Sequence, residues 1–554
     1  MFTVLSGLLL FAGVCAVSVC IGVIVQRKTN HAMQQSFIRH SSYIRFMQDK
    51  HDLNRFGIAQ QLNRHMGGFS VFGLSFSTLS VIGGAVFLLG PAVAAGGTAV
   101  VGIGWPVLAL FGLATACSLA SFASSVPTAG GCYHWTTAIG GRRSGMISGW
   151  FNLIGTVLML VTTNLLCAGW LDRIASSRFG YQEGAWPFYS ILAVLFVSQA
   201  LVNMRGIGLL SRMLSAMTWV HALFVLIMVA ALAAFAWPGF YPLDLLYISG
   251  PMNSADGAGH ETSMLLGMLI LQKMFLGSDA AAQTAEETYE PRINVPWGIY
   301  LSVVYTFIFG FVLFAFLVIN YPFGTEGFAS YGDLPVWMDR IWARWGVTVS
   351  AVAAGLIALL GWSSGLGTMT SASRTWFAMA RDGVVPFAKR AAEVSERYRT
   401  PLSSIVSVAA ASAIISIASG VIGWHTAELA MLVNLISLGL AAIHISYAIP
   451  IVIKFTAHRH KRPPVTQGPW QLGKIGLTAD TISLLWLPAS SVYVIWRLEP
   501  TLQISTCTAA VLCIILIELK YRRLRGPFKS VDPLRFSRRT LDEMIRIERK
   551  FPQQ

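Results

Sequence analysis

The sequence is poor in charged residues and lacks the clusters that catalysis or metal binding requires. Only 12% of its 554 residues are charged, whereas roughly a quarter are charged in a soluble globular protein. Its seven cysteines form no CxxC pair and lie almost wholly in apolar runs, so neither a disulfide framework nor a metal site is indicated. No HExxH or GxSxG motif is present. We therefore expect no enzymatic activity, no metal and no cofactor.

One segment has a partial likeness to a nucleotide-binding motif. The sequence GPWQLGK over 468–474 begins like a phosphate-binding loop. It continues with Ile475 instead of Ser or Thr, and no strand precedes it. We conclude that the chain has no nucleotide site of this kind and expect no ATP-driven activity.

Apolar residues, by contrast, make up 55% of the chain. A helix needs about 20 apolar residues to cross ~30 Å of hydrocarbon. One such run covers residues 5–25, and twelve more follow near 70–90, 102–124, 146–169, 186–203, 212–236, 264–284, 296–319, 347–376, 402–422, 427–453, 479–497 and 501–519. The sequence predicts an all-α polytopic membrane protein with twelve core transmembrane helices and an extra N-terminal helix.

The positive charges are distributed unevenly between the connecting loops. Most of the 40 Lys and Arg residues fall in loops on one side, and short basic loops stay in the cytoplasm. The net charge of +15 is therefore mainly a signal of topology, and we expect no nucleic-acid partner. We predict a multi-pass protein of the cell membrane, plasma or inner, whose core N-terminal segment and C-terminus are cytoplasmic.

The ends of the chain have several interpretations. Residues 1–25 form a spanning helix, a signal peptide or an upstream extension that the core does not need; the basic QRKTNH that follows favours a helix with its N-terminus outside. Residues 26–68 are predicted to be a cytoplasmic lead-in, and 124–145 a packed cytoplasmic loop. The basic tail 520–554 is either solvated or bound to anionic lipid headgroups.

Two apolar runs lose their helical character inside the predicted membrane. The run that begins at Leu265 is interrupted over 275–279, and the run over 76–90 contains the pair Gly83 and Gly84 at its centre. Lipid cannot satisfy freed backbone groups, so such a break requires protein or a watery cavity around it. Transporters use broken helices to hold solutes, and these two breaks are the predicted binding site.

Five segments, in this order, resemble the amino acid/polyamine/organocation permeases. They are FGIAQQLNRHMGGFSVFGLSFSTLS (56–80), PTAGGCYHW (127–135), GWFNLIG (149–155), GSDAAAQTAEETYEPRINVP (277–296) and SASRTWFAMARDGVVP (371–386). The most similar branch contains GABA permeases and choline transporters. The similarity covers about residues 50 to 460.

The resemblance implies the leucine-transporter fold of two inverted five-helix repeats. We assign the first repeat to 69–236, the second to 264–454 and two further helices to 479–519. The implied function is a secondary active transporter that moves amino acids, or amines such as GABA, by alternating access. A proton or sodium gradient, or exchange, would drive it, and its partners would be the small-molecule substrate, the coupling ion and membrane lipids. A choline or polyamine transporter and a non-transporting nutrient sensor are the alternatives.

The resemblance also implies a substrate site. The predicted residues surround the two breaks: Ile82, Gly83, Gly84, Ala85, Asn152, Phe275, Gly277, Ser278 and Asp279. Many relatives carry glycine where Ala85 stands. The glycine pair has an alternative role in close helix packing, and Asp279 has one as a capping or gate carboxylate. Lys273 could pair with Asp279, meet a substrate carboxylate or extend toward water.

Two further groups of residues are assigned by analogy. For ion or proton coupling, His221 is suited to carry a proton, while Ser363, Ser364 and Thr368 are placed where relatives bind sodium. A hydrogen-bonded core histidine and hydroxyls bonded to their own helix are the alternatives. We expect the inner gate to be formed by ion pairs among Glu286, Glu287, Arg292 and Arg381, together with Arg374 and Asp382. The alternative is that these residues lie in a solvated loop.

Overall fold

The computed structural model describes residues 2–35, 42–236, 242–249, 263–321, 334–423, 428–459, 468–524 and 538–551. In this part of the chain the regular structure is helical, and one isolated bridge joins Met66 to Thr288. Among the described residues, thirteen helical segments are long and apolar enough to cross a membrane. The predicted all-α membrane architecture is confirmed.

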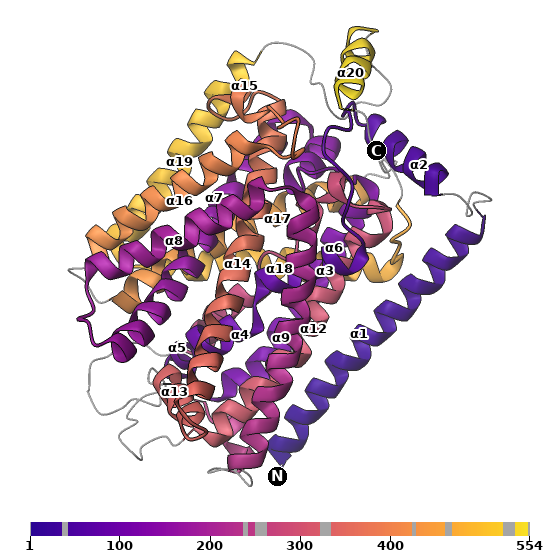
Figure 1. Cartoon of the computed structure of the whole chain (residues 1–554). Helices are drawn as coiled ribbons and strands as arrows, with labels where there is room; N and C mark the ends of the chain where they lie inside the picture. Colours follow the sequence, from indigo (N-terminus) through magenta and orange to yellow (C-terminus); the bar gives the residue numbers. More distant parts are fainter. Residues whose placement is uncertain are drawn as a thin grey trace.

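The helices form one elongated bundle (Figure 1). Its first part consists of α1 (Phe2–Gln35), α3 (Gly68–Leu79), α4 (Val81–Gly83), α5 (Leu89–Gly96), α6 (Trp105–Ser125), α7 (Cys132–Phe179), α8 (Ala185–Met204) and α9 (Ile207–Ala236). Its second part consists of α10 (Met264–Gln272), α11 (Ala280–Gln283), α12 (Pro291–Asn320), α14 (Val347–Arg381), α16 (Leu402–Gly423), α17 (Glu428–Arg459), α18 (Lys474–Trp496) and α19 (Pro500–Arg523). Shorter helices are α2 (Ser42–Asn54), α13 (Leu334–Ala343), α15 (Ala388–Ala391) and α20 (Arg538–Lys550).

Helix α1 packs against the bundle along α12. The Tyr300 hydroxyl donates to the Ser18 carbonyl at 2.5 Å, and the Phe11 ring stacks on Phe311 with centroids 4.2 Å apart. The helix continues ten residues past the apolar run, to Gln35, because the following segment contains no proline or glycine to end it.

The predicted loop 124–145 is packed but is more regular than expected. Residues from Cys132 onward are helical and join the spanning part of α7 at a kink, where Gly141 has a φ of 79°. The side chains of Tyr133, His134 and Trp135 are buried. A glycine tolerates this positive φ without steric cost, so it allows a short helix to turn back over the end of the bundle.

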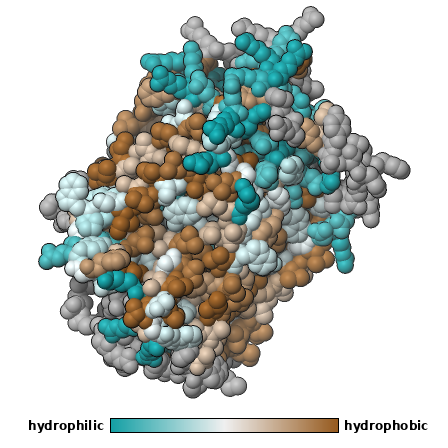
Figure 2. Space-filling model, in the orientation of Figure 1, coloured by the Kyte–Doolittle hydropathy of each residue, from teal (hydrophilic) through white to brown (hydrophobic). Residues whose placement is uncertain are grey.

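Hydrophilic residues gather at the end of the molecule where α2, α15 and α20 lie, and mainly apolar residues cover its middle (Figure 2). We refer to the end with α2, α15 and α20 as the charged end. There Lys50 of α2 pairs with Glu548 of α20 at 2.7 Å. Part of the basic tail, 525–537, and most of the connection 237–263 between α9 and α10 lie outside the described residues.

In the centre, the broken helices are surrounded by long continuous ones. Helix α3 packs against α9, α12 and α14, and α7 packs against α14 and α17. The core of large buried side chains includes Trp105, Phe307 and Phe314. This arrangement encloses both breaks within protein. The backbone groups that an interrupted helix frees need hydrogen-bond partners, which lipid cannot supply.

Candidate functional site

The first break lies at Ser80, three residues before the predicted glycine pair. Helix α3 ends at Leu79, and Ser80 adopts a left-handed conformation with φ 54° and ψ 83°. Its Oγ accepts a hydrogen bond from the Gly83 N–H at 3.2 Å, which caps α4. Gly83 and Gly84 are themselves helical. The break therefore lies inside the predicted run 76–90 but not at the glycine pair, because a serine that caps the next helix ends α3 without a glycine.

Gly84 of the glycine pair serves close packing between the two breaks. A Cβ atom on Gly84 would collide with the side chain of Met274, which lies next to the second break. Residues Gly84–Leu88 continue as one π-helical turn, a feature often found at functional sites. The packing role that the sequence left open thus applies to Gly84.

His221 of α9 reaches into the first break. Its Nε2 accepts a hydrogen bond from the Ile82 N–H at 3.1 Å, and its ring lies 5.0 Å from that of Phe76. The side chain is fully buried. Since Nε2 accepts this bond, protonation of that nitrogen would break it and release the start of α4.

The second break lies at the predicted place. Helix α10 ends at Gln272, a 3-10 turn covers Lys273–Phe275, and α11 begins at Ala280. Gly277 has a φ of 93°, and an added Cβ would lie 2.8 Å from Thr78 Cγ2. The two breaks therefore touch each other here, and this contact leaves room only for glycine.

A serine on α3 holds the second break in place. The Ser75 Oγ donates to the Ser278 carbonyl at 2.7 Å and accepts from the Ala281 N–H at 3.0 Å. These bonds satisfy backbone groups that the interruption leaves without helical partners. Ser75 was not predicted, because its only signal in the sequence is a hydroxyl in the segment before the break.

Asp279 is the centre of a buried polar network. Its Oδ1 accepts from the Tyr447 hydroxyl at 2.5 Å, and its Oδ2 accepts from Asn152 Nδ2 at 3.2 Å and from Gln283 Nε2 at 3.5 Å. The carboxylate thereby joins α7, α11 and α17. Tyr447 was not predicted, because a single tyrosine in an apolar run gives no sign of the residue that it meets.

A small polar cavity lies between the two breaks. Its volume is about 20 Å³, enough for a single water molecule. The lining residues are Thr78, Thr156, Met159, Thr163, Lys273, Leu276, Gly277, Thr368, Ser371 and Ile443.

Of the predicted substrate residues, Gly277 lines this cavity and the others do not. The remaining predicted residues are Ile82, Gly83, Gly84, Ala85, Asn152, Phe275, Ser278 and Asp279. Phe275 instead packs on Trp105, with ring centroids 4.7 Å apart. In this conformation the site is closed around a space smaller than an amino acid.

The hydroxyl groups proposed for coupling are bonded to backbone carbonyls. Ser364 Oγ donates to the Thr78 carbonyl at 3.0 Å, immediately before the first break. Ser363 and Thr368 donate to carbonyls of their own helix, at Leu360 and Ser364. The hydroxyls of Ser363 and Thr368 are therefore hydrogen-bonded to their own helix, which was the alternative to sodium binding. Thr368 also lines the cavity.

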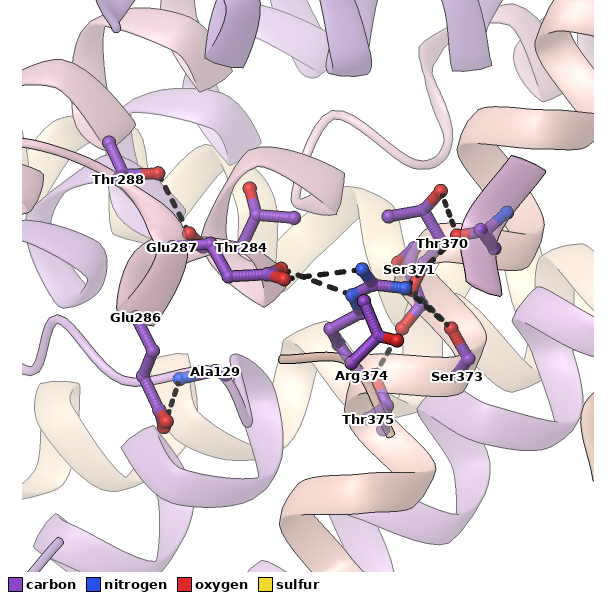
Figure 3. A network of polar contacts seen from close by, with 12 residues as sticks. Ala129, Thr284, Glu286, Glu287, Thr288, Thr370, Ser371, Ser373, Arg374 and Thr375 are labelled. Atoms are coloured by element: carbon purple, nitrogen blue, oxygen red, sulfur yellow. Dashed lines mark hydrogen bonds and ion pairs between the residues drawn. The ribbon is translucent and has the colours of Figure 1, made fainter. Parts of the chain in front are cut away.

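An ion pair between Glu287 and Arg374 is completely buried toward the charged end. Arg374 Nε and Nη2 donate to the two carboxylate oxygens of Glu287 at 3.1 and 3.2 Å, as Figure 3 shows. Both side chains have an exposed fraction of 0%. Burial raises the pKa of Glu287, and the charge of Arg374 opposes that shift. Arg374 also donates to Asn203 Oδ1 at 3.0 Å, so the guanidinium of α14 connects the 3-10 turn Ala285–Glu287 with α8.

A second ion pair joins Glu286 to Arg381, with distances of 2.6 and 2.9 Å. Glu286 also accepts from the Ala129 N–H at 3.1 Å. Arg292, the other predicted gate arginine, belongs to neither of these pairs. Its Nη1 lies 3.4 Å from Asp52 Oδ1 of α2.

Residues of the lead-in contribute to this end, which the sequence analysis did not predict. Arg64 Nη1 donates to the Thr288 carbonyl at 2.6 Å, and Gln60 Nε2 donates to the Glu286 carbonyl at 2.9 Å. The N–H groups of His65 and Met66 donate to the Glu287 carbonyl at 2.9 and 3.0 Å. The lead-in is therefore part of the structure that holds the ion pairs.

Two broken helices around a polar cavity, with buried ion pairs toward one end, define a polytopic membrane protein of the permease type. A family model described as amino acid permease matches residues 66–517. The chain therefore belongs to the amino acid permease family.

Curated relatives agree with this assignment. The chain is 27% identical to the amino-acid permease BAT1 of Arabidopsis thaliana, over 79% of this chain and 87% of the relative. It is 24% identical to the amino-acid permease 2 of Neurospora crassa, over 89% and 91% of the two chains. It is also 24% identical to the GABA-specific permease of Saccharomyces cerevisiae, over 77% and 74%.

Proposed function

We propose that this protein is a secondary active transporter that carries amino acids, or related amines such as GABA, by alternating access. The observation that carries the proposal is the polar cavity between the Ser80 and Gly277 breaks, buried inside a membrane-type bundle. In membrane proteins, broken backbone and an ionisable side chain at such a place are typical of a solute pathway.

The charged end is assigned to the cytoplasm of a cell membrane, because its loops carry most of the positive charge. The Glu286–Arg381 and Glu287–Arg374 pairs, together with the lead-in beneath them, close the path from the cavity to this end. We infer that these pairs form the inner gate and that they separate when the protein opens toward the cytoplasm.

The experiment that tests this proposal is solute uptake by purified protein in proteoliposomes. Radiolabelled amino acids, GABA, choline and putrescine are offered in turn under an imposed proton gradient, an imposed sodium gradient and neither. Accumulation of an amino acid or GABA supports the proposal. Binding of a solute with no flux under any gradient would contradict transport and indicate a nutrient sensor.

His221 is the proposed proton carrier, since its protonation would release Ile82 and the start of α4. We expect the His221→Gln variant to keep solute exchange but to lose accumulation driven by a proton gradient. If this variant still accumulates solute at the wild-type level under a proton gradient, His221 is not the proton carrier. If uptake is instead driven by sodium and is lost in the Ser364→Ala variant, the coupling ion is sodium, and it binds at the oxygens around Thr78.

A further inference from the structure

The cavity between the breaks contains one charged side chain. Of the ten residues that line it, Lys273 alone carries a charge, and five others present hydroxyl groups: Thr78, Thr156, Thr163, Thr368 and Ser371. Lys273 is half-buried. The site therefore has one basic group in otherwise neutral surroundings.

Protein groups do not neutralise this ammonium. An ammonium group has three hydrogen-bond donors, and Lys273 Nζ donates to Thr163 Oγ1 at 3.2 Å. No carboxylate among the described residues lies within ion-pair distance of it. The nearby acid in sequence, Asp279, is bonded instead to Tyr447, Asn152 and Gln283. A half-buried positive charge without a counter-charge is costly, and a bound anion would compensate it.

The alternative anion site, at the start of α4, is already filled by protein atoms. The Ile82 N–H donates to His221 Nε2 and the Gly83 N–H donates to Ser80 Oγ. Neither Ile82 nor Gly83 lines the cavity. The N–H groups of Ile82 and Gly83 therefore bond to protein atoms and do not face the cavity in this structure.

We propose that Lys273 is the carboxylate anchor of the site and selects solutes that carry a carboxylate group. The inference rests on the proposed function, and it decides between the substrate classes that the sequence left open. An amino acid or an omega-amino acid places its carboxylate on Lys273 and its amine among the hydroxyl groups. Choline and polyamines carry only positive charge, so Lys273 repels them.

The test compares a carboxylate solute with the same molecule without its carboxylate. Labelled GABA and alanine uptake is measured in competition with unlabelled GABA, butylamine, alanine and ethylamine. Choline and putrescine are included as competitors. The variants are Lys273→Met, which removes the charge at similar length, and Lys273→Arg, which retains it.

Lys454→Met is the matched control. Lys454 is also a half-buried lysine of the bundle, but it pairs with Asp480 at 3.0 Å and does not line the cavity. Thermal unfolding and size-exclusion profiles in detergent establish that each variant is folded. Binding of labelled solute to protein in detergent provides a second readout that does not need transport.

In the wild type, we expect GABA and alanine to compete at least about tenfold better than butylamine and ethylamine, which corresponds to one ion pair of modest strength. Lys273→Met should lose this preference and admit choline or putrescine, whereas Lys273→Arg and Lys454→Met should keep it. Unchanged preference for the carboxylate solute in folded Lys273→Met would overturn the inference, as would wild-type uptake of choline alone. Wild-type protein that binds with this preference but shows no flux would refute the proposed transport and leave the anchor intact.

Discussion

Buried charge is the most prominent feature at the level of single residues. The side chains of Glu287 and Arg374 are fully buried. The guanidinium of Arg374 donates two hydrogen bonds to the carboxylate of Glu287 in a bidentate arrangement. Removing one member of such a pair leaves an uncompensated charge in the interior, whereas removing both can be nearly neutral. The pair therefore makes stability depend on both residues together.

We predict that Arg374→Met lowers the free energy of unfolding by about 3–5 kcal/mol, because the Glu287 carboxylate loses its partner. The double variant Glu287→Gln with Arg374→Met should recover most of this loss. Thermal unfolding of the purified protein in detergent measures both effects. Equal destabilisation by the single and double variants would show that the lost contacts of Arg374 with Asn203, and not the ion pair, dominate.

Asp49 of α2 should make stability depend on pH. Its Oδ2 accepts from the Glu290 N–H at 2.9 Å and lies 3.9 Å from Arg64 Nη1. Burial raises its pKa to about 6, although Arg64 acts in the opposite direction, and the charges of Glu290 and Asp52 add to the rise.

Because this pKa is higher in the folded protein than in the unfolded chain, protonation of Asp49 favours the folded state. We predict that the contribution of Asp49 to stability increases as the pH falls from about 7 to about 4 and is constant above that range. The thermal midpoint of wild type relative to Asp49→Asn, measured at several pH values, checks this. A difference that does not change between pH 7 and 5 would contradict it.

At the level of elements, the sequence predicted the two interrupted helices but located one of them better than the other. The second break is at Gly277, where a positive φ and the contact with Thr78 require glycine. The first is at Ser80, because a serine side chain can cap the next helix and stabilise a left-handed residue. Composition alone marks glycines, so it pointed to Gly83 and Gly84 instead.

The partners of site residues could not be predicted for a related reason. Asp279 and Lys273 were both singled out in the sequence, yet Tyr447 and Thr163 come from helices far away in the chain. Which of them meet depends on how the helices rotate against one another. The role of Arg64 was likewise hidden, since a basic residue in a polar lead-in normally indicates only solvent exposure.

The break at Gly277 gives a prediction for this element. Gly277→Ala places a Cβ atom 2.8 Å from Thr78 Cγ2, at a φ of 93°, and such strain is worth about 1–3 kcal/mol. We expect a lower thermal midpoint and at least a severalfold loss of solute uptake. Gly355→Ala in α14 is the control, because its Cβ would meet nothing within 4 Å. Wild-type uptake by Gly277→Ala would show that the break does not shape the site.

At the level of the whole molecule, the bundle surrounds a nearly closed cavity with a structured barrier toward the charged end. The barrier includes the two ion pairs and the lead-in segment that bonds to the carbonyls of Glu286 and Glu287. A cavity of about 20 Å³ must widen to accept a solute, and widening toward the charged end requires these bonds to separate. Under the proposed function, this closed cavity is the state that holds a solute between two openings.

Counterflow in proteoliposomes tests this central claim most directly. Vesicles are loaded with a high concentration of unlabelled solute, diluted into a trace of labelled solute, and kept without ion gradients. A carrier that alternates between two openings predicts a transient accumulation of label above the outside concentration, because returning unlabelled solute reorients the site. Equilibration of label without any such overshoot would contradict alternating access and indicate a channel-like path, and no entry of label would contradict transport altogether.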